Sequence, residues 1–135
     1  MPITLFDVTQ RRLNNQHLLR PSLLTPQAVV SWLVAVQSQD YTGAKWSVGQ
    51  RMPTATDAVL DEAFNTGAIL RTHVLRPTWH FVAPADIRWL LMLTAPRVHA
   101  VNGTMYRQTG LDEAMLGQSA AIITHGFAGG KRFDP

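Results

Sequence analysis

The feature that most constrains this chain is a change of hydrophobic period near residue 68. Ile69–Leu75 and Thr78–Val82 are rich in β-branched and aromatic residues, a composition typical of strands. Arg76 and Pro77 separate the two runs, and proline is favoured at an early position of a tight turn. The sequence therefore predicts a β-hairpin here.

Elsewhere the apolar residues recur at helical spacing. Thr25 followed by Pro26 is a strong helix start, because threonine caps the first turn and proline suits the first helical position. Thr54, three residues before Asp57, predicts another start, and Gly67 suits the residue just past a helix end. We expect helices over residues 4–15, 25–40, 44–51, 54–66, 84–96 and 112–127.

Two of these helices carry specific expectations about burial. Three apolar residues of the first helix should face inward: Leu5, Val8 and Leu13. Four apolar residues of the helix after the hairpin should do the same: Ile87, Leu90, Leu91 and Leu93. Pro96 should bend or end that helix, before a connector that contains Gly103.

Three helices followed by a hairpin is the order of a winged helix-turn-helix, in which the third helix usually enters the major groove of DNA and the hairpin touches the neighbouring backbone. We therefore expect a mainly α-helical chain with a small β-hairpin, the winged-helix domain and its N-terminal helix covering residues 1–110. The last helix presents an apolar stripe with little sequence after it. We expect residues 111–135 to be the truncated start of a second winged-helix unit.

The charge of the chain is distributed unevenly. Twelve basic and nine acidic side chains give a net charge of +3. Between residues 68 and 110 a single acid, Asp86, stands against five arginines: Arg71, Arg76, Arg88, Arg97 and Arg107. The planar guanidinium fork suits phosphate oxygens, so a polyanion is a natural partner. The alternative is a solvated surface that is rich in arginine.

Composition excludes several classes of protein. The chain has no cysteine, and therefore neither a disulfide framework nor a thiolate nucleophile. No apolar run is long enough to cross a bilayer, and the first residues lack the profile of a secretory signal. His73 and His80 lack a helical metal-ligand spacing. We expect a cytoplasmic protein without metal, cofactor or membrane contact.

Three runs of the sequence are specific in combination: Val36–Tyr41, Gly43–Trp46 and Leu70–Val82. Together they resemble the winged-helix DNA-binding-domain family that includes the AlkZ-like DNA glycosylases, and Pro84–Arg97 is similar to the helix that follows in that family. Members of the family are usually much longer, with several winged-helix units in tandem around a DNA-binding channel. The resemblance implies the first unit of such an array and the start of the next.

The glycosylases of this family have a Gln-aliphatic-Gln motif that organises the hydrolytic water. The matching positions are Gln37 and Gln39, and the resemblance implies that both are catalytic. Ser38 departs from the pattern by replacing the aliphatic residue, and Pro77 departs from it where the turn more often has glycine.

A carboxamide suits only an easy hydrolysis, because its oxygen is too weakly basic to deprotonate water at neutral pH. The base of an N-alkylated purine is already cationic, so its glycosidic bond is weak and a well-oriented water is enough. Asp40 is the alternative carboxylate, able to stabilise positive charge or accept the proton. The competing interpretation is that Gln37 and Gln39 are solvent-facing residues at the end of a helix.

Seven residues are expected to contact DNA: Lys45, Trp46, Arg51, Arg71, His73, Arg76 and His80. The basic side chains would hold phosphates, although Lys45 could instead form an imine. Trp46 is the tryptophan best suited to stack on a base, the alternative being a place in the core. We expect the hairpin arginines and the glutamine pair to share one concave surface.

These expectations favour a DNA-repair hydrolase, a monofunctional glycosylase that cleaves the N-glycosidic bond of alkylated purines in double-stranded DNA. The alternatives are a non-catalytic DNA-binding module, such as a regulator, and a protein-interaction domain whose last helix docks a partner. Either further C-terminal winged-helix domains or a partner protein would cover that helix.

Overall fold

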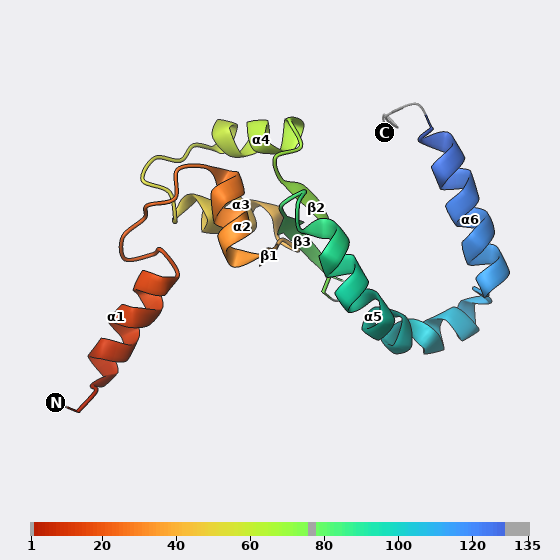
Figure 1. Cartoon of the computed structure of the whole chain (residues 1–135), viewed down its shortest axis with the longest axis horizontal. Coiled ribbons are helices and arrows are strands. Elements are labelled where there is room, and N and C mark those ends of the chain that lie inside the picture. The colour runs from red at the N-terminus through yellow and green to blue at the C-terminus, as the bar shows by residue number, and fades with distance from the viewer. Residues whose placement is uncertain (1, 76–77, 129–135) are drawn as a thin grey trace. The chain divides into compact units, whose positions relative to one another are not determined.

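The computed structural model describes residues 2–75 and 78–128 (Figure 1). The chain divides into two units, residues 1–96 and 97–135. Helices dominate, with one small antiparallel sheet. The elements are α1 (Leu5–Asn15), α2 (Pro26–Leu33), β1 (Ala35–Gln37), α3 (Tyr41–Gly49), α4 (Asp57–Asn65), β2 (Leu70–His73), β3 (Trp79–Val82), α5 (Ile87–Thr109) and α6 (Glu113–Gly126).

The predicted hairpin is confirmed. Strands β2 and β3 pair antiparallel, with Leu70 opposite Val82 and His73 opposite Trp79. The expected turn at residues 76 and 77 lies outside the described residues. Strand β1 adds to the other side of β3, so the sheet order is β1-β3-β2. This mainly helical arrangement with a small three-stranded sheet is consistent with a winged-helix-like fold.

The prediction of one helix over residues 25–40 is wrong in its second half. Helix α2 ends at Leu33, and the next residue, Val34, has a φ of 67°. A β-branched residue rarely adopts this left-handed conformation, which ends the helix and redirects the chain. The chain continues as β1, and pairing with β3 places Val36 beside Phe81. Tertiary pairing therefore overrides the helical spacing of the apolar residues.

Two apolar clusters cover the two faces of the sheet. On one face Phe81, which is fully buried, packs with residues of α2, α3 and α4, and its ring lies 4.8 Å from that of Phe64 and 5.7 Å from that of Tyr41. On the other face Val82 packs with Leu90 of α5. The sheet is a thin layer between helices, and its side chains alternate between the two clusters.

The helix starts follow local capping chemistry. Thr25 caps α2 with Pro26 in its first turn, and Gly67 follows α4 with a φ of 74°, both as predicted. The cap of α4 is Thr56, not Thr54: the Thr56 hydroxyl accepts a hydrogen bond from the Val59 N–H at 3.3 Å. An acceptor three residues before the N–H that it caps is the geometry expected of a helix start.

Helix α1 forms where it was predicted, but its expected inward face is wrong. Among its described side chains none is buried, and Leu5 is 88 % exposed. The helix is attached near its end, where the Trp32 indole N–H donates to the Asn15 carbonyl at 3.3 Å and the same ring meets His17 edge-on. These contacts hold the C-terminal turn of α1, whereas Leu5, Phe6 and Leu13 are exposed and Val8 is only partly buried.

Helix α5 is longer than predicted. It continues through Pro96 and Gly103 to Thr109, so the expected connector is wrong. Of the two outcomes expected at Pro96, a bend or an end, the end is wrong. Pro96 is exposed, and the helical carbonyl that loses its donor there can be hydrated. Of the four apolar residues expected to face inward, Leu90 is buried and Ile87 partly buried, whereas Leu91 and Leu93 are exposed.

Helix α6 begins after its cap Asp112, as predicted. Its apolar residues are exposed within the part of the chain that the structure describes, including Leu116, Ile123 and Phe127.

Candidate nucleic-acid interface

The two glutamines of the predicted motif flank the end of β1, not the end of a helix. Gln37 is the last residue of the strand and is exposed. It lies opposite His80 of β3, which lies opposite Thr72 of β2. Since directly opposed residues share a face of the sheet, Gln37, His80 and Thr72 point to the same side.

Gln39 lies beyond the strand and is also tied to β3. Its side-chain oxygen accepts a hydrogen bond from the Trp79 N–H at 3.3 Å, and the Ser38 N–H donates to the Trp79 carbonyl at 2.8 Å. The Gln39 oxygen keeps a second lone pair and the amide keeps its N–H donors. Asp40 caps α3, its carboxylate accepting from the Gly43 N–H at 3.1 Å. The glutamine segment is therefore a fixed corner between β1 and α3.

Arg71 of β2 clamps this corner. Its Nη2 and Nε donate to the Ser38 carbonyl at 2.9 and 3.3 Å. The guanidinium also lies over two rings, 4.6 Å from the centre of Trp79 and 5.4 Å from that of Tyr41. His73 continues the stack, with its ring 4.0 Å from that of Trp79. The sequence did not single out Tyr41 or the Ser38 carbonyl, because only the pairing of β1 with β3 brings them to Arg71.

The expectation that the hairpin arginines and both glutamines share one surface is wrong for Arg71 and Gln37. Arg71 lies in the same cross-strand row as Val36 and Phe81, and Gln37 lies in the next row. Adjacent rows point to opposite faces of a sheet. Arg71 therefore meets the glutamine segment through the Ser38 backbone at the sheet edge. Arg76 lies outside the described residues.

Three residues expected to contact DNA are buried: Lys45, Arg51 and His80. The His80 ring has its Nδ1 2.9 Å from the Thr78 carbonyl. The Arg51 guanidinium donates to the Ser47 carbonyl at 2.6 Å and to the Gln16 side chain at 3.3 Å, and burial lowers its pKa. The Arg51 side chain therefore links α3 to the residue that follows α1.

Lys45 is held between two carboxylates of α4. Its Nζ lies 2.5 Å from an oxygen of Asp57 and 2.5 Å from an oxygen of Asp61. The hydrogen bonds to Asp57 and then Asp61 raise the pKa of Lys45, which favours the charged ammonium over the neutral amine that imine formation needs. Helix α4 carries these two acids and Glu62 but no basic residue. Helix α4 therefore offers no cation of its own to DNA phosphates, and the neighbouring Lys45 is already paired with two of its acids.

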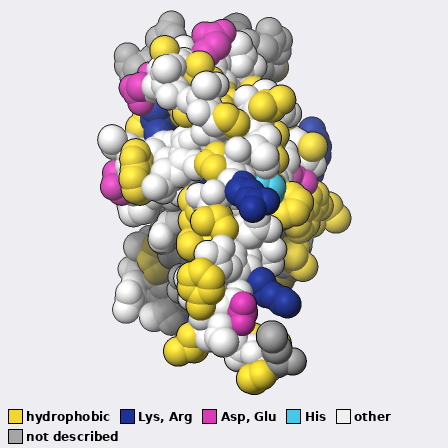
Figure 2. Space-filling view, turned by 90° about the vertical axis from the view of Figure 1, so that its left-hand side faces the viewer, with side chains coloured by type: hydrophobic (Ala, Val, Ile, Leu, Met, Phe, Trp, Pro, Cys, Tyr) yellow, Lys and Arg dark blue, Asp and Glu magenta, His cyan; other side chains and the backbone are white. Residues whose placement is uncertain are grey.

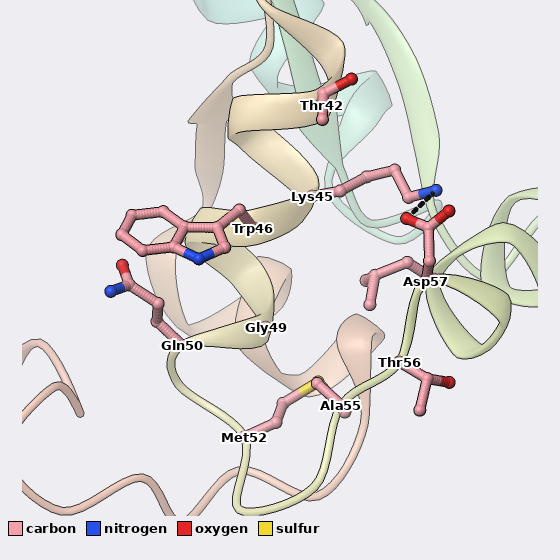
Figure 3. A pocket seen from close by; sticks show the side chains of 10 residues that line it. Thr42, Lys45, Trp46, Gly49, Gln50, Met52, Ala55, Thr56 and Asp57 are labelled. Atoms are coloured by element: carbon pink, nitrogen blue, oxygen red, sulfur yellow. Dashed lines mark ion pairs between the residues drawn. The ribbon is translucent and has the colours of Figure 1, made fainter.

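Trp46 stands at an open pocket between α3 and α4 (Figure 3). Its indole is 67 % exposed, so the alternative of a core position is wrong. The pocket has a volume of about 530 Å³, with Met52 and Leu60 among its apolar lining and Gln50 next to the indole. The Lys45–Asp57 ion pair borders it on the other side.

Neither a metal centre nor a membrane span is found in the described ranges. No three His, Asp or Glu side chains there are placed to share a metal ion. No described helix combines the length and apolar character needed to cross a membrane.

The described residues form a small, mainly helical domain whose three-stranded sheet carries two exposed glutamines at the corner of residues 37–40. The sequence model of a family described as "DNA glycosylase AlkZ-like" matches residues 30–132. The chain belongs to this family. No curated protein and no solved structure matches it.

Proposed function

We propose that this chain binds double-stranded DNA and takes part in hydrolysing the N-glycosidic bond of an N-alkylated purine. The observation that carries the proposal is membership of the AlkZ-like DNA glycosylase family over residues 30–132, which include the corner with Gln37 and Gln39. The finer assignment, a winged helix-turn-helix that is the first unit of a tandem array, belongs to the same proposal.

The proposed catalytic groups are the carboxamides of Gln37 and Gln39. Gln37 is exposed, and the Gln39 oxygen is fixed by the Trp79 N–H, so one amide is free to move and the other is preorganised. The N-alkylated purine, cationic while attached, would depart with the bonding electrons as a neutral base and leave the positive charge on the sugar. A water held between the two carboxamides would then form the new C–O bond at the anomeric carbon, and the proton that it loses would pass to Asp40 or to solvent. Asp40 is the nearest carboxylate in sequence and is restrained as the cap of α3.

Fewer residues are available for DNA contacts than the sequence predicted. His73 and Trp46 are exposed and available, and Arg71 could reach a phosphate only by releasing Ser38. Lys45 and Arg51 would have to break ion pairs or hydrogen bonds that they already make. Phosphate contacts by arginines outside this region are therefore required for tight binding.

The test is release of an alkylated purine from duplex DNA by the protein and by a Gln37→Ala/Gln39→Ala double variant. The matched control is Gln27→Ala, an exposed glutamine of α2. We expect release by the protein and the control and at least a hundredfold slower release by the double variant, on the order of the loss for a positioned catalytic group. Equal release by all three proteins would remove the catalytic assignment. DNA binding without release by any of them would favour the non-catalytic DNA-binding module.

A further inference from the structure

A second candidate site lies at the C-terminal end of α1, outside the residues that match the family. It is an open hollow of about 280 Å³. Its lining consists of carboxamides, guanidinium groups and one leucine: Gln10, Arg11, Asn14, Asn15, Leu19 and Arg20. These polar groups are hydrogen-bond donors suited to phosphate oxygens.

The backbone brings the two ends of this hollow together. His17 has a φ of 53°, a left-handed residue that reverses the chain after α1. The N–H groups of Leu18 and Leu19 both donate to the Leu13 carbonyl, at 2.9 and 3.3 Å. The connector therefore folds back on the helix, and Arg20 comes to line the same hollow as Arg11.

The same hydrogen bonds reduce the repulsion that the C-terminal carbonyls of α1 would exert on an anion bound in this hollow. The C-terminal end of a helix carries partial negative charge on its unpaired carbonyls. At α1 the carbonyls of Arg12, Leu13 and Asn14 accept bonds from the chain that follows. Their partial charges are thus partly neutralised.

The charge balance of this segment is positive. Residues 2–29 contain one acid, Asp7, and three arginines, Arg11, Arg12 and Arg20. Asp7 is occupied at the far end of α1, where it accepts from the Thr4 N–H at 2.9 Å. Figure 2 shows both Lys and Arg side chains (dark blue) and Asp and Glu side chains (magenta) on the face of the molecule that lies at the left of Figure 1.

We propose that this hollow binds a phosphodiester group of duplex DNA, held by Arg11 and Arg20 with the carboxamides as further donors. The inference rests on the DNA binding proposed above and adds a contact that the family match does not include. The open shape favours a polyanion over a free anion, because counterion release adds to the affinity of each phosphate contact along DNA.

The experiment measures duplex DNA binding by fluorescence anisotropy from 50 to 300 mM salt. It compares the full chain with an Arg11→Gln/Arg20→Gln variant. The control, Arg12→Gln/Arg88→Gln, removes two exposed arginines that do not line the hollow. Glutamine is nearly as good a helix former as arginine, and circular dichroism melting checks that each variant folds.

Each phosphate contact contributes about 0.9 to the steepness of log K against log salt. Loss of two contacts in the Arg11→Gln/Arg20→Gln variant should therefore make the slope shallower by about 1.8 and lower the affinity by up to about 60-fold at 0.1 M salt. The control should change the slope by less than half as much. If the Arg11→Gln/Arg20→Gln variant bound DNA with an unchanged salt dependence, the proposed phosphate site would be overturned and the proposed DNA binding would stand. Equal losses in both variants would assign the effect to net charge and would also overturn the phosphate site.

Two further outcomes separate the site from the proposed function. No binding by the unmodified chain at 50 mM salt would overturn the proposed function and the inference together. Inorganic phosphate should displace DNA no better than chloride of equal ionic strength. Displacement by phosphate in particular, lost in the Arg11→Gln/Arg20→Gln variant, would show a free-anion site in place of a DNA contact.

Discussion

Replacing Arg71 with methionine tests whether its guanidinium stabilises the corner at residues 37–40. Methionine keeps an unbranched chain against the rings but has neither charge nor N–H donors. The guanidinium donates to one oxygen, the Ser38 carbonyl, and stacks on Trp79 and Tyr41. A hydrogen bond from a charged group contributes about 1.5–3 kcal/mol, and each partly exposed cation–π contact about 0.5–1 kcal/mol.

Because these contributions overlap, we expect Arg71→Met to lower the free energy of unfolding by about 2–3 kcal/mol. For a unit of this size that corresponds to a fall in Tm of roughly 10–20 °C. Urea unfolding followed by tryptophan fluorescence measures the change. Arg71→Lys keeps the charge but not the planar fork, and should recover less than half of the loss.

The control is Arg88→Met, an exposed residue of α5, which should change the unfolding free energy by less than about 0.5 kcal/mol. If Arg71→Met changed the free energy of unfolding as little as Arg88→Met does, the contacts of Arg71 with Ser38, Trp79 and Tyr41 would not stabilise the fold. Arg71 would then be available to bind a DNA phosphate.

Phe81→Ala should lower the free energy of unfolding in urea by about 3–5 kcal/mol, because the fully buried ring packs against the rings of Phe64 and Tyr41, and a loss under 1 kcal/mol would contradict that packing. The raised pKa of Lys45 stabilises the fold fully below its ordinary value of 10.5, and that stability is lost as pH rises through the higher folded value. As pH rises above 10.5, the urea midpoint of the Lys45→Met variant should therefore fall less steeply than that of the unmodified protein. An equal pH dependence of the two midpoints would exclude the ion pairs with Asp57 and Asp61. Ser38→Ala should leave stability unchanged or raise it by up to about 1 kcal/mol, since the buried hydroxyl has no partner among the described residues; a clear loss in the same assay would reveal one.

Local chemistry predicted the parts of the fold that depend on neighbours in sequence. Thr25 and Pro26 start a helix, Gly67 takes a positive φ after one, and the two runs beside residues 76 and 77 pair as strands. Each of these features is set within about four residues, by a cap, a turn or an alternating pattern. The Thr54 cap was wrong because Thr56, two residues on, offers the same hydroxyl.

The candidate site was predicted in its residues but not in its arrangement. Gln37 and Gln39 were identified by resemblance, whereas their place at a strand end required β1, which the helical spacing of Val29, Val30 and Leu33 concealed. The spacing continued past the point where Val34 turns the chain. Local pattern cannot show that a more distant strand offers better hydrogen bonds.

The sequence by itself determined that this chain is mainly helical, that it carries one hairpin and that it resembles the AlkZ-like family. Only the tertiary structure decided which charges are free. Lys45 meets Asp57 and Asp61, and Arg71 meets the Ser38 carbonyl, at separations of 12 residues or more along the chain. A charged side chain is available to a ligand only if it does not already form an ion pair or hydrogen bond within the protein. The packing of helices and strands determines which groups come close enough to form one.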